Sequence, residues 1–306
     1  MRIGTRGSAL ALAQSEHVRA SLPGGEREHR LLIIKTAGDL QPHLSLTRMG
    51  GKGLFTKEIE EALLRGDIDL AVHSLKDLPT EERPGLKIGA LLPREDPRDA
   101  LISRSKLPLD KLPAGATIGT SSLRRRSQIL ARRPDLKVED MRGNVPTRIA
   151  RVEEGRFDAI VIAAAGLLRL KLIDRATEII DEAIMLPAPG QGVMAIQIRS
   201  NDKATEEAVR TLHDDDANAE ATAERALLQE LGGGCMVPVG ARATAKGGSL
   251  QLVAFVGHPS GRPSIRLSAA GEASAAEAVG RALAALMLGQ GARRILEEVR
   301  SSERFP

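Results

Sequence analysis

Aromatic residues are almost absent from the sequence: 306 residues include four Phe and no Tyr or Trp. The hydrophobic cores must therefore be built from Leu, Ile, Val and Ala. The same scarcity argues against a surface for single-stranded nucleic acid, because such surfaces stack bases on exposed aromatic rings. We expect no nucleic-acid partner, although a nucleic-acid binder remains a rival that strongly salt-dependent affinity would reveal.

Cysteine and long apolar runs are also scarce. The single cysteine rules out an intrachain disulfide and suits a reducing compartment. No uninterrupted apolar run approaches the roughly 18 residues that a membrane span needs. The first residues, MRIGTRGSAL, lead into a strand-like run without an apolar signal segment. We expect a cytoplasmic protein with no membrane partner.

Charge is balanced overall but not locally. The chain has 44 basic and 40 acidic residues, a net charge of +4. The stretch 119–151 contains only three acidic residues against nine basic ones, namely Arg124, Arg125, Arg126, Arg132, Arg133, Lys137, Arg142, Arg148 and Arg151. A local excess of this kind calls for an anionic partner.

Two stretches look like copies of one design. Residues 2–5 and 118–120 each read as a strand that leads through a Gly/Ser turn into a helical run, 9–22 or 123–133. Serine stands where the cap of each helix belongs. A second echo pairs residues 66–72 with 155–161, each a turn that feeds a buried strand. The repeated order predicts two related α/β lobes with largely parallel sheets.

Two Pro-rich stretches, 93–99 and 186–190, lie where the chain could cross between the lobes, and the strand-like run 193–198 could return to the first. We therefore expect a two-strand hinge, with residues 1–92 and 193–211 in lobe 1 and 98–187 in lobe 2. Two-lobed binding proteins of the periplasmic type share this layout, with the ligand between the lobes. At 32.6 kDa the chain is too long for one ordinary core.

The remainder, 215–306, reads as a small α+β domain. The pattern predicts a helix at 217–231 that ends in three glycines, then three short strands and two helices, at 237–242, 250–256, 264–269, 273–288 and 292–299. Cys235 follows the glycines directly. A lone cysteine is usually a small buried hydrophobe. The glycines leave room beside the sulfur, however, and Pro238 restrains the other flank, so the loop could carry a covalent group.

Two further clusters suggest chemistry. Lys76 and Asp77 follow the strand 70–72, where residues of a parallel sheet face a ligand; in isolation they could equally be an ordinary loop ion pair. His73 has no Cys or carboxylate at ligand spacing, so we expect no metal site. Three arginines, 124–126, occupy the first turn of a helix, where cations are unfavourable unless an anion sits among them.

More anion-binding side chains follow the same logic. Arg142 and Arg148 offer guanidinium groups suited to carboxylate or phosphate. Arg169 lies after the strand and turn at 160–166, and Arg6 with Ser8 forms the matching anion site in the first lobe. Two helix N-termini that face one cleft fit a small polyanion better than a duplex surface.

Taken together and in order, these segments resemble the porphobilinogen deaminase family along essentially the whole chain. The matching stretches are 5–8 (TRGS), 50–55 (GGKGLF), 71–77 (AVHSLKD), 94–99 (REDPRD), 119–125 (GTSSLRR), 142–145 (RGNV), 190–192 (GQG) and 233–238 (GGCMVP). Pro146 stands where glycine is expected and Arg48 where lysine is often found. Neither departure touches the core chemistry.

The resemblance implies a transferase of tetrapyrrole (haem) biosynthesis. A dipyrromethane cofactor would be joined to Cys235 by a thioether. Porphobilinogen would lose ammonia to give an azafulvene that the free end of the growing chain attacks. After four additions, hydrolysis would release hydroxymethylbilane. Asp77 matches the family's catalytic acid, which bonds pyrrole N–H groups and stabilises the cation.

The resemblance also implies binding roles. Cofactor carboxylates would be held by Lys76, Ser122, Arg124, Arg125 and Arg148, and the substrate by Arg6, Ser8, Arg142, Arg169 and Gln191. Lys52 and Phe55 fall in a glycine-rich loop like the family's cover over the cleft. The resemblance points to a monomer whose partners are porphobilinogen and the growing polypyrrole chain. A non-catalytic two-lobed binding protein for a small anion is the alternative.

Overall fold

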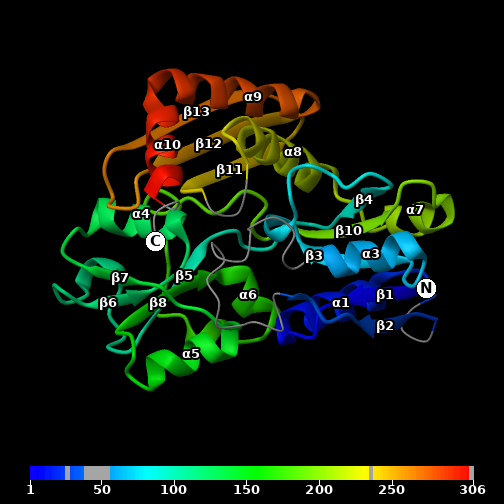
Figure 1. The fold of residues 1–306 in the computed structure, drawn as a ribbon, viewed down its shortest axis with the longest axis horizontal. Coiled ribbons are helices and arrows are strands. Elements are labelled where there is room, and N and C mark those ends of the chain that lie inside the picture. The colour runs from blue at the N-terminus through cyan, green and yellow to red at the C-terminus, as the bar shows by residue number, and fades with distance from the viewer. Residues whose placement is uncertain (25–27, 38–55, 234–236, 303–306) are drawn as a thin grey trace.

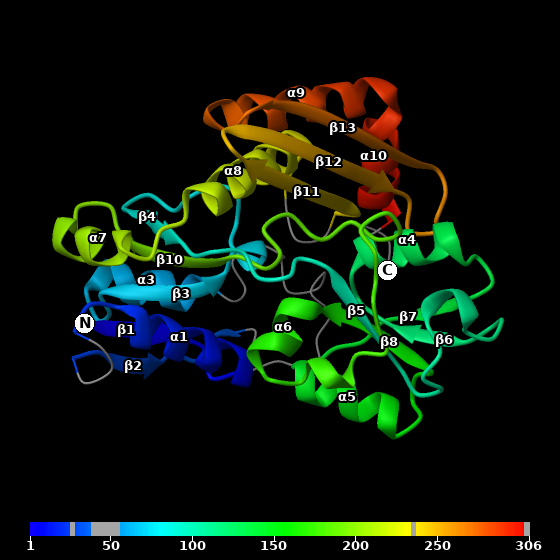
Figure 2. The same cartoon turned by 180° about the vertical axis from the view of Figure 1, so that it is seen from behind.

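The computed structural model describes residues 1–24, 28–37, 56–233 and 237–302, and it contains three sheets. Figure 1 shows them as three parts: two lobes side by side and a third part, coloured yellow to red, that lies across both. Figure 2 shows the same arrangement from behind. In the described part of the chain, no helix is both long and apolar enough to cross a membrane.

The first lobe is built on a five-stranded sheet in the order β2-β1-β3-β10-β4. Its strands are β1 (Arg2–Thr5), β2 (Arg30–Ile33), β3 (Leu70–Ser74), β4 (Leu86–Leu91) and β10 (Met194–Arg199). Its helices are α1 (Ala9–Ser21), α3 (Lys57–Arg65) and α7 (Lys203–Arg210), and the short helix η1 (Leu75–Asp77) follows β3. The strand predicted at 193–198 does return to this sheet as β10.

The second lobe repeats that order as β7-β6-β8-β5-β9. Its strands are β5 (Asp99–Ser103), β6 (Thr117–Gly119), β7 (Lys137–Glu139), β8 (Ala159–Ala163) and β9 (Glu178–Ile179). Its helices are α4 (Leu123–Arg132), α5 (Val145–Glu153) and α6 (Ala164–Arg169), with short turns η2 (Leu109–Lys111) and η3 (Ile173–Arg175). Each sheet position in one lobe therefore has a counterpart in the other.

The two copies also end a helix in the same way. Gly66 after α3 and Gly155 after α5 both have φ +76°, the left-handed conformation that glycine adopts without strain. The amide of Gly66 donates to Leu63 O and that of Gly155 to Val152 O, each over 3.0 Å. The sequence echo at 66–72 and 155–161 thus corresponds to a shared helix-to-strand turn.

The prediction of largely parallel sheets was wrong, because both sheets are mixed. In the first lobe β1 pairs in parallel with β2 and β3, whereas β10 pairs antiparallel with β3 and β4. In the second, β6 is parallel to β7 and β8, and β5 is antiparallel to β8 and β9. The reversed strands, β5 and β10, are those that the chain enters directly after crossing from the other lobe.

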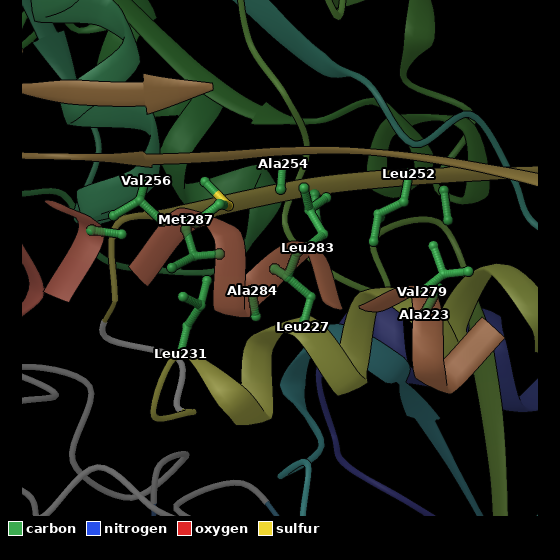
Figure 3. Packing of buried hydrophobic residues seen from close by; sticks show 14 of the residues in the cluster. Ala223, Leu227, Leu231, Leu252, Ala254, Val256, Val279, Leu283, Ala284 and Met287 are labelled. Atoms are coloured by element: carbon green, nitrogen blue, oxygen red, sulfur yellow. The ribbon is translucent and has the colours of Figure 1, made fainter. Parts of the chain in front are cut away.

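The third part has a three-stranded antiparallel sheet, β11-β12-β13. Its elements are α8 (Asp215–Glu230), β11 (Val239–Lys246), β12 (Ser249–Gly257), β13 (Ser264–Glu272), η4 (Ala273–Ala275), α9 (Ala276–Met287), η5 (Leu288–Ala292) and α10 (Arg293–Ser302). Figure 3 shows its core, in which Leu227 of α8, Leu231 directly after that helix, and Leu283 and Met287 of α9 lie beneath the sheet. The predicted α+β layout is confirmed.

This third part touches both lobes. Arg266 of β13 donates to the carbonyls of Ala183 and Glu182, which follow β9 of the second lobe. On the other side, Ala221 of α8 belongs to a buried cluster with Leu75 and Leu78 of the first lobe. The helix α8 is therefore packed directly against the segment that follows β3.

Candidate active site

The segment after β3 carries the first two candidate residues, Lys76 and Asp77. Leu75 is 1% exposed and packs into a buried cluster. Asp77 is exposed and Lys76 is partly buried. Burial lowers the pKa of Lys76 to about 8, with the Asp77 carboxylate acting in the opposite direction. The turn therefore presents an acidic side chain next to a lysine that loses its proton more easily than an ordinary lysine.

A chain of polar contacts leads from this turn into the second lobe. Nζ of Lys76 donates to Oε1 of Gln191 over 3.1 Å. Nε2 of Gln191, which is 1% exposed, donates to the Pro97 carbonyl at 2.6 Å and to Oδ1 of Asp99 at 2.9 Å. Gln191 thus joins both crossing segments to the first lobe.

Asp99, the first residue of β5, is completely buried and binds two arginines. Its Oδ2 accepts from Arg124 at 2.6 Å, and its Oδ1 accepts from Arg125 at 2.7 Å. Burial alone would raise the pKa of Asp99, but the two guanidinium charges outweigh it and hold that pKa far below its usual range.

The sequence predicts an anion among the arginines of α4, and Asp99 is such an anion within the chain itself. Two of the three have an internal carboxylate, and they also donate to carbonyls, Arg124 to Leu186 and Arg125 to Val161. A signal in the sequence was available: Asp99 opens the apolar run of β5, and a carboxylate at such a position needs a cationic partner. Ser122 caps α4 as predicted by accepting from the amide of Arg125.

Further cations of the second lobe lie close to this group. Burial and the charges of Arg125, Arg151 and Arg142 lower the pKa of Arg148 to about 10, and the Asp77 carboxylate opposes them. Arg148 donates to Gly143 O at 2.7 Å and Arg151 donates to Arg142 O at 2.6 Å. The structure therefore brings Asp77 of one lobe near Arg148 of the other.

The predicted substrate residues of the first lobe lie at the end of β1. Ser8 caps α1, and its Oγ accepts from the Ala11 amide at 3.3 Å. Arg6 is partly buried, close enough to His73 to influence its titration. Burial lowers the pKa of His73 to about 4, so this histidine is neutral at physiological pH.

Arg169, at the end of α6, lies farther along the boundary between the lobes. Its Nη2 donates to Gly192 O at 2.5 Å. It lines a pocket of about 560 Å³ together with Gln14 and His17 of α1 and Arg94 and Glu95 of the first crossing. Arg169 thus lies at the hinge, bonded to the residue that follows Gln191.

Sequence reasoning missed a second buried ion cluster at the hinge. Arg94 of the first crossing pairs with Glu220 at 2.6 Å and with Glu224 at 3.1 Å, both on α8. Glu224 also accepts from the amides of Gly190 in the second crossing and Ala243 in β11. The third part of the molecule is therefore bonded to both crossings through one helix.

Three predicted residues, Cys235, Lys52 and Phe55, lie outside the described residues, and so does Arg48. The residues before Cys235 are described: Gly232 and Gly233 have φ of +92° and +43°. A Cβ on Gly233 would lie 3.2 Å from Oγ1 of Thr80. The stretch leading to the cysteine therefore contacts the segment that begins at Asp77. Within the described ranges, no His, Cys, Asp and Glu side chains cluster as a metal site.

The site places the exposed Asp77 beside cations of both lobes, Lys76 and Arg148, an arrangement that suits an anionic ligand. Family models match the chain over residues 1–207 (porphobilinogen deaminase, dipyrromethane cofactor binding domain) and 218–289 (porphobilinogen deaminase, C-terminal domain). The chain belongs to the porphobilinogen deaminase family. Its function is porphobilinogen deaminase activity in tetrapyrrole biosynthesis, with a dipyrromethane cofactor, which sets aside the alternative of a non-catalytic binding protein.

Similar curated proteins cover nearly the whole length. Porphobilinogen deaminase from Acidithiobacillus ferrooxidans is 48% identical over 306 residues, covering 99% of each chain. That from Deinococcus radiodurans is 48% identical over 303 residues, covering 97% of this chain and 98% of the relative. Among solved structures, an ancestral cationic amino acid solute binding protein matches at 14% identity and TM-score 0.40, covering 69% of this chain and 87% of that one.

Proposed function

We propose that Asp77 is the catalytic acid and that Cys235 carries the dipyrromethane as a thioether. The observation that carries this proposal is the position of Asp77, exposed on the turn after β3 and next to Lys76, whose Nζ is bonded to Gln191 at the second crossing. Asp77 acts electrostatically on Lys76 beside it and on Arg148 of the second lobe. A carboxylate at this position can accept pyrrole N–H bonds and stabilise a substrate cation.

The residues present fit a cofactor with acetate and propionate groups. Lys76, Ser122, Arg124, Arg125 and Arg148 would hold its carboxylates. Asp99 neutralises part of the charge of Arg124 and Arg125, and Arg142, Arg148 and Arg151 add further positive charge nearby. The bound cofactor supplies the pyrrole carbon at which chain growth begins.

The incoming porphobilinogen would be held by Arg6, Ser8, Arg142, Arg169 and Gln191. Ser8 uses an oxygen lone pair to cap α1, which leaves its hydroxyl hydrogen for a substrate carboxylate. Gln191 is already bonded to Lys76 and Asp99. We infer that Gln191 acts mainly by holding Lys76 and Asp99 in place.

Asp77 would then act on the substrate in two ways. Its carboxylate would orient the pyrrole through the ring N–H and offset the positive charge that develops as ammonia leaves. It would also accept or return a proton at its own oxygen during each addition. Four additions followed by hydrolysis would give hydroxymethylbilane.

The remaining assignments are also proposals. Residues 1–92 with 193–211, residues 98–187 and residues 215–306 would be the three domains, and the three separate sheets support that division. Lys52 and Phe55 would belong to a cover over the site. We also propose that the chain is a cytoplasmic monomer with no nucleic-acid partner. Sedimentation tests the monomeric state.

Intact mass and turnover test the roles of Cys235 and Asp77. The purified chain should be heavier than its sequence by one dipyrromethane, and Cys235→Ser should remove that mass. Asp77→Ala should keep the added mass and the fold but lose turnover by about 10²-fold or more. Asp67→Ala, which removes a surface carboxylate paired with Arg65, is the control. Near-normal turnover in Asp77→Ala would remove that residue from its role.

A further inference from the structure

The side chain of Arg225, on α8, lies against the segment that immediately follows Asp77. Its Nη2 donates to Pro79 O at 2.7 Å and to Thr80 O at 3.3 Å, and its Nη1 lies 3.4 Å from Leu78 O. One planar guanidinium therefore fixes three consecutive carbonyls. Burial lowers the pKa of Arg225, and the Glu82 charge opposes that effect.

The same helix holds this segment at a second point, one turn earlier. Ala221 lies four residues before Arg225, so the two share a face of α8. Ala221 is packed in a buried cluster with Leu75 and Leu78, which flank Lys76 and Asp77. One face of α8 therefore holds the turn that carries Asp77 at two points, through the apolar contact of Ala221 and the hydrogen bonds of Arg225.

The C-terminal end of α8 leads towards the cysteine. The Gly233 amide donates to Leu228 O at 2.8 Å, which folds the chain back on the end of the helix. Arg300 of α10 donates to Leu231 O at 3.1 Å and lies beside Gly232. The resulting glycine turn meets Thr80, one of the residues that Arg225 holds.

We propose that Arg225 is a positioning residue, which fixes the Asp77 segment against the glycine turn two residues before Cys235. The inference rests on the proposed roles of Asp77 and Cys235 and extends them. If Asp77 and Cys235 must stay at a fixed distance while the chain grows, the helix that leads to Cys235 should also hold the Asp77 segment. That helix is α8. The side chain of Arg225 supplies that connection without contacting substrate.

The alternative is that Arg225 only fastens the third part of the molecule to the first lobe. Arg266 offers a matched control, because it makes the same kind of contact to the second lobe through Ala183 O and Glu182 O, both at 2.8 Å. A fastening role predicts that Arg225→Met and Arg266→Met behave alike. A positioning role predicts effects confined to Arg225→Met.

The experiment compares the full-length Arg225→Met, Arg225→Lys and Arg266→Met enzymes. Three quantities are measured: hydrogen exchange of the amides at 80–83, the rate of cofactor attachment to apoenzyme by intact mass, and kcat and KM of loaded enzyme. We expect the amides of this segment in Arg225→Met to exchange about tenfold faster than in wild type, and the cofactor to attach about tenfold more slowly. The kcat of the loaded variant should fall about tenfold, with KM within twofold of wild type. Arg225→Lys should recover part of each loss.

Two outcomes overturn the proposal. One is loaded Arg225→Met with kcat and exchange within twofold of Arg266→Met. The other is a loss in KM alone. If Arg225→Met is insoluble, Arg225→Lys carries the test, and wild-type exchange and kcat in that variant would count against positioning. Asp77→Ala measured in parallel separates the hypotheses: normal turnover there contradicts the role of Asp77, whereas an inactive Asp77→Ala beside a normal Arg225→Met contradicts positioning alone.

Discussion

Asp99 of β5 accepts hydrogen bonds from both Arg124 and Arg125 and is itself completely buried. The three charged groups form one desolvated unit at the point where the first crossing enters the second lobe. The unit lies one hydrogen bond from Gln191 and two from Lys76. The stability of the second lobe and the position of the candidate site thus depend on the same carboxylate.

The first prediction concerns that carboxylate. Asp99→Asn should destabilise the chain by about 3–5 kcal/mol, because two buried guanidinium charges lose their only buried anion in the group. Asp110→Asn is the control, since Asp110 makes a comparable pair with Arg132 at 2.6 Å on the surface, and it should have a much smaller effect. Urea denaturation measures both. Equal losses would contradict the central role of Asp99.

The low pKa of Asp99 sets the pH range over which this contribution holds. A carboxyl whose pKa is lowered by folding contributes stability above its unfolded pKa of about 3.9. That stability is lost as pH falls through the folded pKa, which lies far lower. The difference between wild type and Asp99→Asn should therefore stay constant near neutrality and shrink only in strong acid.

The second prediction follows from Lys76. Its folded pKa is about 8, below the roughly 10.4 of an unfolded lysine, so folding costs stability while the group is charged and the cost is relieved above pH 8. The same loss of charge weakens carboxylate binding. This pKa applies to the chain without cofactor, so we expect the rate of cofactor attachment, followed by intact mass, to fall through an inflection near pH 8.

Variants of Lys76 check the assignment. Lys76→Met should attach the cofactor more slowly at pH 7 and show no inflection near pH 8. Lys87→Met removes a surface lysine that pairs with Glu206 at 2.6 Å, and it should keep the wild-type profile. An unchanged inflection in Lys76→Met would assign the titration to another group.

The third prediction tests the close contact of α8 with α9 in the core seen in Figure 3. A Cβ on Gly280 would lie 2.2 Å from Ala223 O, so Gly280→Ala should cost about 1–3 kcal/mol by forcing the helices apart. Gly289→Ala, with nothing within 4 Å, should be neutral or stabilising by up to about 1 kcal/mol. Differential scanning calorimetry compares them, and similar melting temperatures would contradict the proposed close contact.

Much of the fold was predictable because its signals are local. Ser8 and Ser122 stand at helix caps, and the echo of 66–72 at 155–161 reports a shared helix-to-strand turn with glycine at φ +76° in both copies. The strand directions were not predictable in the same way. Antiparallel β5 and β10 follow from the path of the chain between lobes, which no short segment encodes.

The sequence alone determined the residue chemistry: a lone cysteine after three glycines, an Asp beside a Lys after a buried strand, and an excess of arginine. Ordered motifs along the chain were sufficient to indicate the family. Only the tertiary structure decided which charges meet. Asp99 lies 25 residues before Arg124, and Arg225 lies 145 residues after Thr80. Pairings of this kind depend on desolvation and on geometry between distant segments, and these exist only once the lobes and the third part have assembled.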